Sequence, residues 1–448
     1  MEYISEYKRK LTTADEAVKI VKSGDWIDIG PINSQVVELD RALAKRKDEL
    51  TDVKVWSLLT IRYPKMAEAD PTGETFIWHS WHMSATDRKM AGTGRPLYYS
   101  SIKYSELPRY VREHIEPIDV AMLQAGPMDK HGYLNFGPQN SHTKAICDRA
   151  KVIIVEINEK MPRCLGGYEE AIHISKVDYV VEGDNPALVE LPGIESSEVD
   201  KKAAQYIIDE MHDDCCLQLG IGGMPNAVGK IIAGSDLKNL GCHTEMLVDA
   251  YVDMFEAGRL NNLKKNINPG KMVYSFALGT QKVYNFIDDN PQCAIFPVNY
   301  TNDPYIAAQN DNMMSINNAI EVDLYGQICS ESSGTRIISG TGGQLDFVLA
   351  GYESSGGKSF ICLPSSYAGK DGKRKSRIVP TLTNGAIVTT PRSVGQYIVT
   401  EYGKFCMKGM SVWQRAEGLI NIAHPDFKDD LVRAAEKQGV WRRSHKLI

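Results

Sequence analysis

The chain has 448 residues, of which 43% are hydrophobic and 24% are charged, and its formal net charge is -6. This length exceeds the roughly 300 residues at which a single hydrophobic core stops growing, so we expect two or more domains. The ordinary composition indicates a soluble globular protein. The mild acidity argues against nucleic acid or an anionic membrane as the main partner.

The amino-terminal segment, residues 1–25, mixes acidic and basic side chains and lacks the apolar core of a signal peptide. No apolar run is long enough to span a bilayer. Nine cysteines occur without a CxxC pair, and this favours reduced structural thiols over a disulfide framework or a zinc site. We therefore expect a cytoplasmic protein that does not enter a membrane.

Short apolar runs rich in Val and Ile alternate with amphipathic stretches along the chain. The runs lie at residues 25–30, 53–59, 118–125, 151–158, 214–222, 271–279, 293–299, 358–365 and 386–390. Buried parallel strands have this composition, and the amphipathic stretches between them fit covering helices. The sequence therefore predicts an α/β fold with open sheets.

Two pairs of segments resemble each other, which suggests an internal repeat. Residues 24–44 and 214–233 both read as a strand, a Gly-containing turn and a helix, while 118–137 and 317–334 both read as a strand and a polar turn. Either the chain is duplicated, or two independent α/β units follow the same folding rules. Residues 182–202 resemble a linker. We therefore expect an N-terminal domain over 1–190 and a C-terminal domain over 191–448.

The segment LQLGIGGMPNAVG places Gly220, Gly222 and Gly223 after a buried strand, and Pro225 in the first turn of a following helix. Backbone N–H groups at such a helix start bind phosphate or stabilise an oxyanion. A dinucleotide fingerprint would require a glycine at the position of Pro225, so a standard Rossmann site is not expected. A tight turn without a ligand is the alternative.

A second glycine-dense turn, ISGTGGQLDF at residues 338–347, contains Gly342 and Gly343 and allows a ligand to approach the backbone. The nearby SSGGKSF segment superficially suggests a P-loop. Its glycine spacing fails by one residue, and Lys358 leads into a strand instead of a helix. We therefore do not expect nucleoside triphosphate binding.

Residues 368–378 form a glycine-containing basic segment with five cationic side chains: Lys370, Lys373, Arg374, Lys375 and Arg377. One interpretation is a solvated loop. The other is an electrostatic clamp for a ligand that carries several phosphate charges.

The stretch GCHTEMLVDAYVDMFEAG, residues 241–258, contains four carboxylates at helical spacing: Glu245, Asp249, Asp253 and Glu256. If the whole stretch is helical, the four share one face. Along a helix they extend over about 16 Å, which is too far for one metal ion, so we expect no metal site here. The alternatives are a solvated acidic face, or a nucleophilic role for Glu245 with the other three carboxylates in solvent.

Several separated motifs resemble one known family. They are GPMDKHGYLNFG, VIIVEINEKMPR, GIGGMPNAVG, HTEMLVDAYVDM, INNAIEVDLYGQI, SGTGGQLDF and RAEGLINIAHPDF. In this order, and over essentially the whole chain, they are similar to the acetyl-CoA hydrolase/transferase group of family I CoA-transferases. The resemblance implies two similar open-sheet α/β domains with the active site between them, and a homo-oligomer.

The resemblance also implies the site residues. Glu245, in HTEM, matches the nucleophile that forms a covalent glutamyl-CoA thioester, and Asn317 matches a polar position next to the reacting acyl group. The positions that match contacts with coenzyme A are Gly220, Ile221, Gly222, Gly223, Met224, Ile320, Gly342, Gly343 and Lys370. No metal and no permanently bound cofactor is implied, because coenzyme A is a substrate.

Within this group, the motifs are most similar to the enzymes that transfer CoA from butyryl-CoA to acetate in fermentation. Transfer to or from another short acyl group, such as 4-hydroxybutyrate, is the nearest alternative. An acyl-CoA hydrolase would use the same nucleophile on water, and a non-catalytic CoA-binding protein would not need Glu245 at all. The expected partners are short-chain acyl-CoA and carboxylate substrates.

Overall fold

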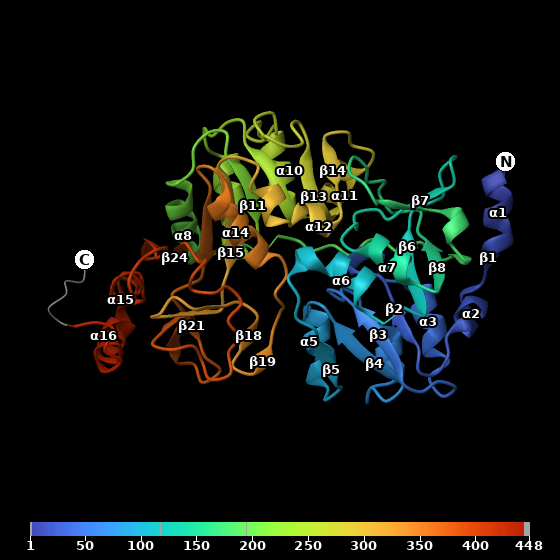
Figure 1. Ribbon diagram of the computed structural model, residues 1–448, viewed down its shortest axis with the longest axis horizontal. Coiled ribbons are helices and arrows are strands. Elements are labelled where there is room, and N and C mark those ends of the chain that lie inside the picture. Colours follow the sequence, from blue (N-terminus) through green and yellow to red (C-terminus); the bar gives the residue numbers. More distant parts are fainter. Residues whose placement is uncertain (1, 117, 194, 443–448) are drawn as a thin grey trace. The chain divides into compact units, whose positions relative to one another are not determined.

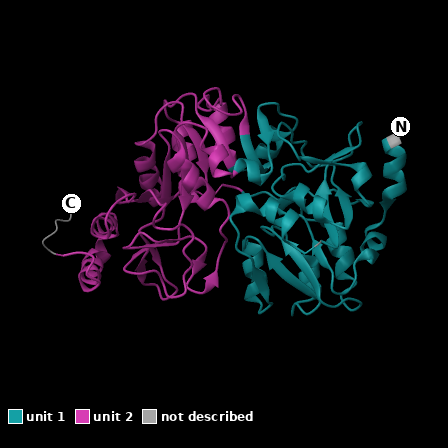
Figure 2. Ribbon diagram, viewed as in Figure 1, with its two compact units in different colours: residues 1–191, 245–247, 273–301 teal, residues 192–244, 248–272, 302–448 magenta. Residues whose placement is uncertain are grey.

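The computed structural model describes residues 2–442, apart from 117 and 194. The chain falls into two compact units, which Figure 2 shows in different colours. Unit 1 comprises residues 1–191, 245–247 and 273–301, and unit 2 comprises residues 192–244, 248–272 and 302–448. The chain passes from unit 2 into unit 1 within one strand, between Thr244 and Glu245.

The first sheet has eight strands in the order β1-β10-β8-β6-β2-β3-β4-β5, and every strand is parallel to its neighbours (Figure 1). Its strands are β1 Leu11–Thr12, β2 Trp26–Asp28, β3 Val53–Ser57, β4 Phe76–Ser80, β5 Leu97–Tyr99, β6 Val120–Ala125, β8 Val152–Ile157 and β10 Tyr179–Glu182. An all-parallel sheet is expected when helices connect successive strands, so the predicted α/β class is confirmed.

The second sheet also has eight strands, in the order β14-β13-β12-β11-β15-β20-β24-β25. The pairings of β11 with β12 and β15, and of β20 with β15 and β24, are parallel, and β24 pairs antiparallel with β25. The strands are β11 Cys216–Leu219, β12 Gly241–Leu247, β13 Met272–Ala277, β14 Cys293–Ile295, β15 Met313–Asn318, β20 Lys358–Cys362, β24 Tyr397–Thr400 and β25 Gly403–Cys406.

The two sheets share one strand order. The order β10-β8-β6-β2-β3-β4-β5 in the first sheet corresponds, strand by strand along the chain, to β24-β20-β15-β11-β12-β13-β14 in the second. We call these two sets of strands the N-terminal repeat and the C-terminal repeat. The match supports duplication. It pairs β6 with β15, which begins at Met313, so the prediction that the counterpart of 118–137 begins at residue 317 is wrong. The polar residues of MMSINN hid the strand from the hydrophobic pattern.

Helices connect and cover the strands. They are α1 Glu2–Lys10, α2 Ala14–Ala17, α3 Glu38–Ala44, α4 Lys65–Ala69, α5 Ala85–Gly92, α6 Leu107–Glu113, α7 Thr143–Arg149, α8 Glu198–Ile208, α9 Gly223–Ala233, α10 Asp249–Glu256, α11 Gln281–Ile287, α12 Val298–Thr301, α13 Pro304–Ala307, α14 Gln344–Glu353, α15 Val412–Asn421 and α16 Lys428–Lys437. In unit 1 the apolar core includes Phe76 and Trp78, and in unit 2 it includes Ile361 and Leu419.

Short strands complete the fold. They are β7 Tyr133–Asn135, β9 Ala171–His173, β16 Glu321–Asp323, β17 Ile328–Cys329, β18 Ser332–Ser333, β19 Arg336–Ile337, β21 Ser366–Ala368, β22 Arg374–Ser376 and β23 Ile378–Val379. They form one three-stranded sheet, β17-β16-β23, and the two-stranded pairs β18-β19, β21-β22 and β7-β9.

Every predicted apolar run contains a strand except residues 386–390. Ile387 is 43% exposed and Val388 is 40% exposed, whereas Thr389 and Thr390 are buried and form only an isolated bridge from Thr390 to Ile328, so the apolar half of this run lies outside the core. Among the described residues, no helix is long and apolar enough to cross a membrane. All nine cysteines are free thiols, and eight of them are buried.

Candidate active site

The stretch at residues 241–258 is not one helix, and the prediction that its four carboxylates share a face is wrong. Residues Gly241–Leu247 form the buried strand β12, Val248 is extended, and helix α10 begins only at Asp249. The carboxylate spacing fits a helix, but GCHTEML fills an interior strand of the second sheet, and burial there overrides the helical spacing. Glu245 therefore lies apart from the helical carboxylates, half-buried on a strand.

Buried hydroxyl groups and a histidine form a cluster near Glu245 within unit 1. The Tyr104 hydroxyl and Ser141 Oγ share a hydrogen bond, and Ser141 Oγ lies 3.0 Å from His142 Nδ1. Burial raises the pKa of Tyr104, and the negative charge of Glu245 raises it further. Burial lowers the pKa of His142 to about 3, so this imidazole is neutral at pH 7. The cluster therefore offers Glu245 neutral polar neighbours.

The loop GPQNSHT, residues 137–143, carries Ser141 and His142 and is docked on β13. The backbone N–H groups of Asn140 and Ser141 donate to Ser275 O at 3.1 and 3.2 Å. Both side-chain amide atoms of Gln139 are buried without a hydrogen-bond partner among the described residues, as is Ser275 Oγ. Buried polar atoms of this kind are usually satisfied by water or a ligand. The loop therefore supplies hydrogen-bonding capacity that the protein itself does not use.

The first predicted glycine turn joins β11 to α9 in unit 2. Gly220 N donates to Ile316 O at 2.8 Å, and Gly222 has φ of 135°, a left-handed value that favours glycine. A Cβ on Gly222 would lie 2.4 Å from Asn318 Nδ2, so a larger residue would displace that side chain and would be strained at this φ. Helix α9 starts at Gly223, with Pro225 in its first turn as predicted. The turn therefore presents backbone N–H groups at a helix start.

The second glycine turn meets the first at the end of β15. Asn318 Nδ2 donates to Ile221 O at 2.7 Å, and Gln344 Nε2 donates to Asn318 O at 3.0 Å. Gln344 opens helix α14 directly after Gly343, and Gly342 has φ of 52°. The position where a Cβ on Gly220 would stand is 3.1 Å from Asn317 Oδ1. Unit 2 therefore brings both glycine turns and Asn317 together. Met224 is buried, whereas Ile221 is 50% exposed.

The basic segment is a β-hairpin of β21 and β22 instead of an open loop. Arg377 Nη1 donates to Ile320 O at 2.8 Å, and its guanidinium lies 4.7 Å from the ring centre of Tyr367. Burial lowers the pKa of Arg377. This arginine therefore links Ile320 to the hairpin and does not reach out to solvent.

The remaining cations of the hairpin differ in whether they form ion pairs. Arg374 Nη1 bonds Asp426 Oδ2 at 2.9 Å, and Lys375 Nζ lies 3.8 Å from Asp371. Lys370 and Lys373 are exposed, and their ammonium groups form no ion pair or hydrogen bond with any described residue. No hydrogen bond among the described residues joins Lys370 to the glycine turns. Lys370 and Lys373 are therefore the cations of this hairpin that are most available for the predicted phosphate clamp.

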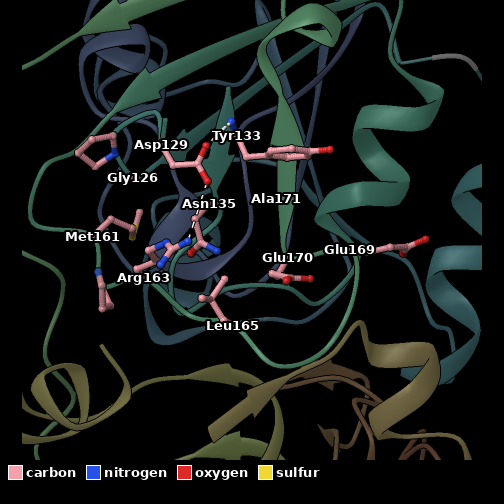
Figure 3. Close-up of a pocket in the computed structure, with 12 residues that line it drawn as sticks. Gly126, Asp129, Tyr133, Asn135, Met161, Arg163, Leu165, Glu169, Glu170 and Ala171 are labelled. Carbon is pink, nitrogen blue, oxygen red and sulfur yellow. Dashed lines mark hydrogen bonds and ion pairs between the residues drawn. The ribbon is translucent and has the colours of Figure 1, made fainter. Parts of the chain in front are cut away.

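Unit 1 contains a pocket of about 610 Å³, and Figure 3 draws the residues that line it. Its wall includes Asp129, Asn135 and Arg163, and Arg163 Nη1 bonds Asp289 Oδ1 at 2.9 Å. The Asn135 amide is satisfied internally, since Nδ2 donates to Cys164 O at 2.8 Å. None of the predicted site residues is among the described residues that line this pocket. Among the described residues, no group of three or more His, Cys, Asp or Glu side chains could hold a metal ion.

Sequence reasoning missed Tyr104, Ser141 and Gln218. Tyr104 meets Ser141 and comes within electrostatic range of Glu245 only through the fold, so no local pattern reveals either residue. Gln218 accepts a hydrogen bond from Asn317 Nδ2 at 3.0 Å, and it gave a signal, because it is a polar residue inside the apolar strand CLQL and a buried amide needs partners.

The chain has two α/β sheets with one shared strand order, a half-buried glutamate on an interior strand, and glycine turns at a strand end. These are the parts of an acyl-transfer enzyme. Models of the N-terminal and C-terminal domains of acetyl-CoA hydrolase/transferase match residues 1–190 and 279–435. The chain belongs to this family, and the CoA-transferase class predicted from its motifs is confirmed.

Relatives and a solved structure agree with the family. The chain is 54% identical over 447 residues to butyryl-CoA:acetate CoA-transferase of Anaerostipes caccae, with 100% of each chain covered. It is 52% identical to probable butyrate:acetyl-CoA coenzyme A-transferase of Syntrophomonas wolfei, with 99% of each covered. The crystal structure of RipA from Yersinia pestis matches with a TM-score of 0.89 and 36% identity, covering 98% of this chain and 100% of that one.

Proposed function

We propose that the chain transfers CoA from butyryl-CoA to acetate, giving butyrate and acetyl-CoA. The observation that carries this proposal is the full-length similarity to the Anaerostipes caccae enzyme. Coenzyme A is a substrate of the family, and the proposal requires no other cofactor. The enzyme works in the cytoplasm as a homo-oligomer, and sedimentation of the purified protein would test its oligomeric state.

The reaction runs through a covalent intermediate on Glu245. The ionised carboxylate attacks the carbonyl carbon of butyryl-CoA, and the carbon–sulfur bond breaks, which gives an acyl-glutamyl anhydride and CoA thiolate. The thiolate then attacks the glutamyl carbonyl carbon, which forms the glutamyl-CoA thioester and releases butyrate. Acetate attacks the glutamyl carbonyl carbon of this thioester, and the carbon–sulfur bond breaks, which gives an acetyl-glutamyl anhydride and CoA thiolate. The thiolate then attacks the acetyl carbonyl carbon, and the bond from this carbon to the glutamyl oxygen breaks. Acetyl-CoA leaves, and the carboxylate is regenerated without net proton transfer.

The glycine turns supply backbone donors for coenzyme A and for developing negative charge. Gly220, Ile221, Gly222, Gly223 and Met224 form the main surface for coenzyme A. Their support is the glycine-only geometry at Gly222 and the start of α9 directly after it.

The remaining roles belong to residues outside this turn. Gly342 and Gly343 extend the surface for coenzyme A, and Ile320 lines it. Asn317 contacts the reacting acyl group, and Lys370 binds the phosphates, which its unpaired and exposed ammonium supports.

A hydrolase would share the first half of this chemistry, because water would replace acetate. The test separates the two reactions by their products. Purified protein receives butyryl-CoA with and without acetate, and acetyl-CoA and free CoA are measured. We expect acetyl-CoA that depends on acetate, with little free CoA. Free CoA released at the same rate without acetate would make the chain a hydrolase, and 4-hydroxybutyryl-CoA as a much better donor would shift the acyl specificity.

A matched pair of variants tests the nucleophile in the same assay. Glu245→Gln removes the carboxylate without changing its shape, and we expect loss of transfer. Glu256→Gln removes an exposed carboxylate of α10 and leaves transfer intact. Substantial transfer by Glu245→Gln would reject the assignment of this residue.

A further inference from the structure

Three side chains on two neighbouring strands of unit 2 form a closed polar group. Gln218 on β11 stands opposite Ser315 on β15, and Asn317 is two residues further along β15, so it points to the same face. Their exposed fractions are 3% for Gln218, 0% for Ser315 and 8% for Asn317. Buried amides at this depth must find hydrogen bonds inside the protein.

The two amides bind each other reciprocally. Asn317 Nδ2 donates to Gln218 Oε1 at 3.0 Å, and Gln218 Nε2 donates to Asn317 Oδ1 at 3.3 Å. Ser315 Oγ donates to Gln218 Oε1 at 2.9 Å and accepts from Asn317 Nδ2 at 3.0 Å. A half-turn of the Asn317 amide alone would set donor against donor and acceptor against acceptor, so Gln218 locks its orientation.

The locked amide stands at the turn that we assign to coenzyme A. Gly220 is so close that a Cβ there would lie 3.1 Å from Asn317 Oδ1, and Gly220 N is bonded to Ile316 O, the residue before Asn317. Gln218 lies deeper than Asn317, as its lower exposure shows. Gln218 therefore acts on a bound substrate through Asn317.

The corresponding strand pair of the N-terminal repeat, β2 and β6, carries different residues at these positions. Asp28 stands opposite Ala121 in the N-terminal repeat as Gln218 stands opposite Ser315 in the C-terminal repeat. Two residues further along, Leu123 occupies the place of Asn317. An apolar Leu and Ala keep the same strand pair together there. The amide group belongs only to the repeat whose strand β12 carries Glu245.

We propose that Gln218 is a positioning residue that, with Ser315, holds the Asn317 amide in the one orientation that serves CoA transfer. The inference rests on the proposed function, which places Asn317 next to the reacting acyl group. It predicts that Gln218 matters for turnover only as long as Asn317 is present.

A double-mutant cycle tests this dependence. Gln218→Leu, Asn317→Ala and the double variant are compared with the wild-type enzyme for kcat, for KM and for the thermal midpoint. We expect Gln218→Leu to lower kcat about tenfold, a size typical for coupled neighbours. In the Asn317→Ala background the same change lowers kcat by less than about twofold. Asp28→Asn, at the matching position of the other repeat, leaves kcat unchanged.

The outcomes separate this proposal from the proposed function. If the wild-type protein fails to transfer CoA, the proposed function falls. If it transfers CoA but the two changes multiply, or if Asn317→Ala keeps full activity, the positioning role is wrong and the function stands. Should Gln218→Leu fail to fold, Ser315→Ala replaces it. Ser315→Ala removes one hydroxyl of the same group, and its effect on kcat must also vanish in the Asn317→Ala background.

Discussion

A buried aspartate in the N-terminal repeat should make the free energy of unfolding depend on pH. Asp28 ends β2 with an exposed fraction of 4%, and its carboxylate accepts a hydrogen bond from Gly30 N at 2.9 Å. Burial raises the pKa of Asp28 to about 7, because one neutral donor does not replace the water lost by the charge. An ordinary aspartate in the unfolded chain has a pKa of about 3.9.

The sign of the effect follows from this pKa shift. Between the two pKa values the folded protein binds more protons than the unfolded chain, so stability falls as the pH rises. The stabilising contribution of neutral Asp28 is complete below about pH 3.9 and is lost as the pH passes through about 7. The slope is about 1.4 kcal/mol per pH unit, so about 4 kcal/mol is lost by pH 8.

Asp28→Asn isolates this group, since the amide oxygen can still accept from Gly30 N while the charge is absent. We expect the variant to gain about 2.5 kcal/mol over the wild-type protein between pH 5 and pH 8 in denaturant unfolding. Asp48→Asn, whose side chain is 91% exposed in the native protein, is the matched control and should follow the wild-type protein at both pH values. An Asp28→Asn variant that also tracks the wild-type protein would refute the reasoning.

Two further predictions concern the binding of coenzyme A. Lys370→Ala should raise KM for butyryl-CoA about tenfold and leave KM for acetate unchanged, because a phosphate contact is lost. Arg374→Ala is the control, because it removes a cation that is already paired with Asp426. Equal effects of the two changes on KM for butyryl-CoA would contradict the assignment. Gly222→Ala should weaken binding of coenzyme A at least about tenfold, since its Cβ would lie 2.4 Å from Asn318 Nδ2 at a left-handed φ, and unchanged KM in steady-state kinetics would show that this turn does not bind coenzyme A.

The hydrophobic pattern was sufficient for the fold class but not for every element. Val- and Ile-rich runs identify buried strands because parallel sheets are covered on both faces. Strand order depends on pairing between distant segments, so the shared order of the two repeats emerged only from the structure. The spacing of Glu245 and Asp249 suggested one continuous helix, which is wrong, because a periodicity of charges does not reveal whether a segment is buried in a sheet.

Some residues of the candidate site could be predicted from the sequence, and others could not. The turn at Gly222 could be predicted because its chemistry is local: glycines, a proline and a helix start. The neighbours of Glu245 in unit 1 could not, since Tyr104 and Ser141 come from distant segments. The charges of the basic hairpin could be read from the sequence. The partner of Arg377 could not, because it is a backbone carbonyl that no charge pattern reveals.

The most direct test of the central claim is the mass of the peptide that contains Glu245 after the enzyme meets butyryl-CoA alone. The account predicts a CoA adduct on this peptide, its discharge by added acetate with formation of acetyl-CoA, and no adduct in Glu245→Gln. An enzyme that forms acetyl-CoA while this peptide stays unmodified, or while the adduct persists in Glu245→Gln, would contradict it.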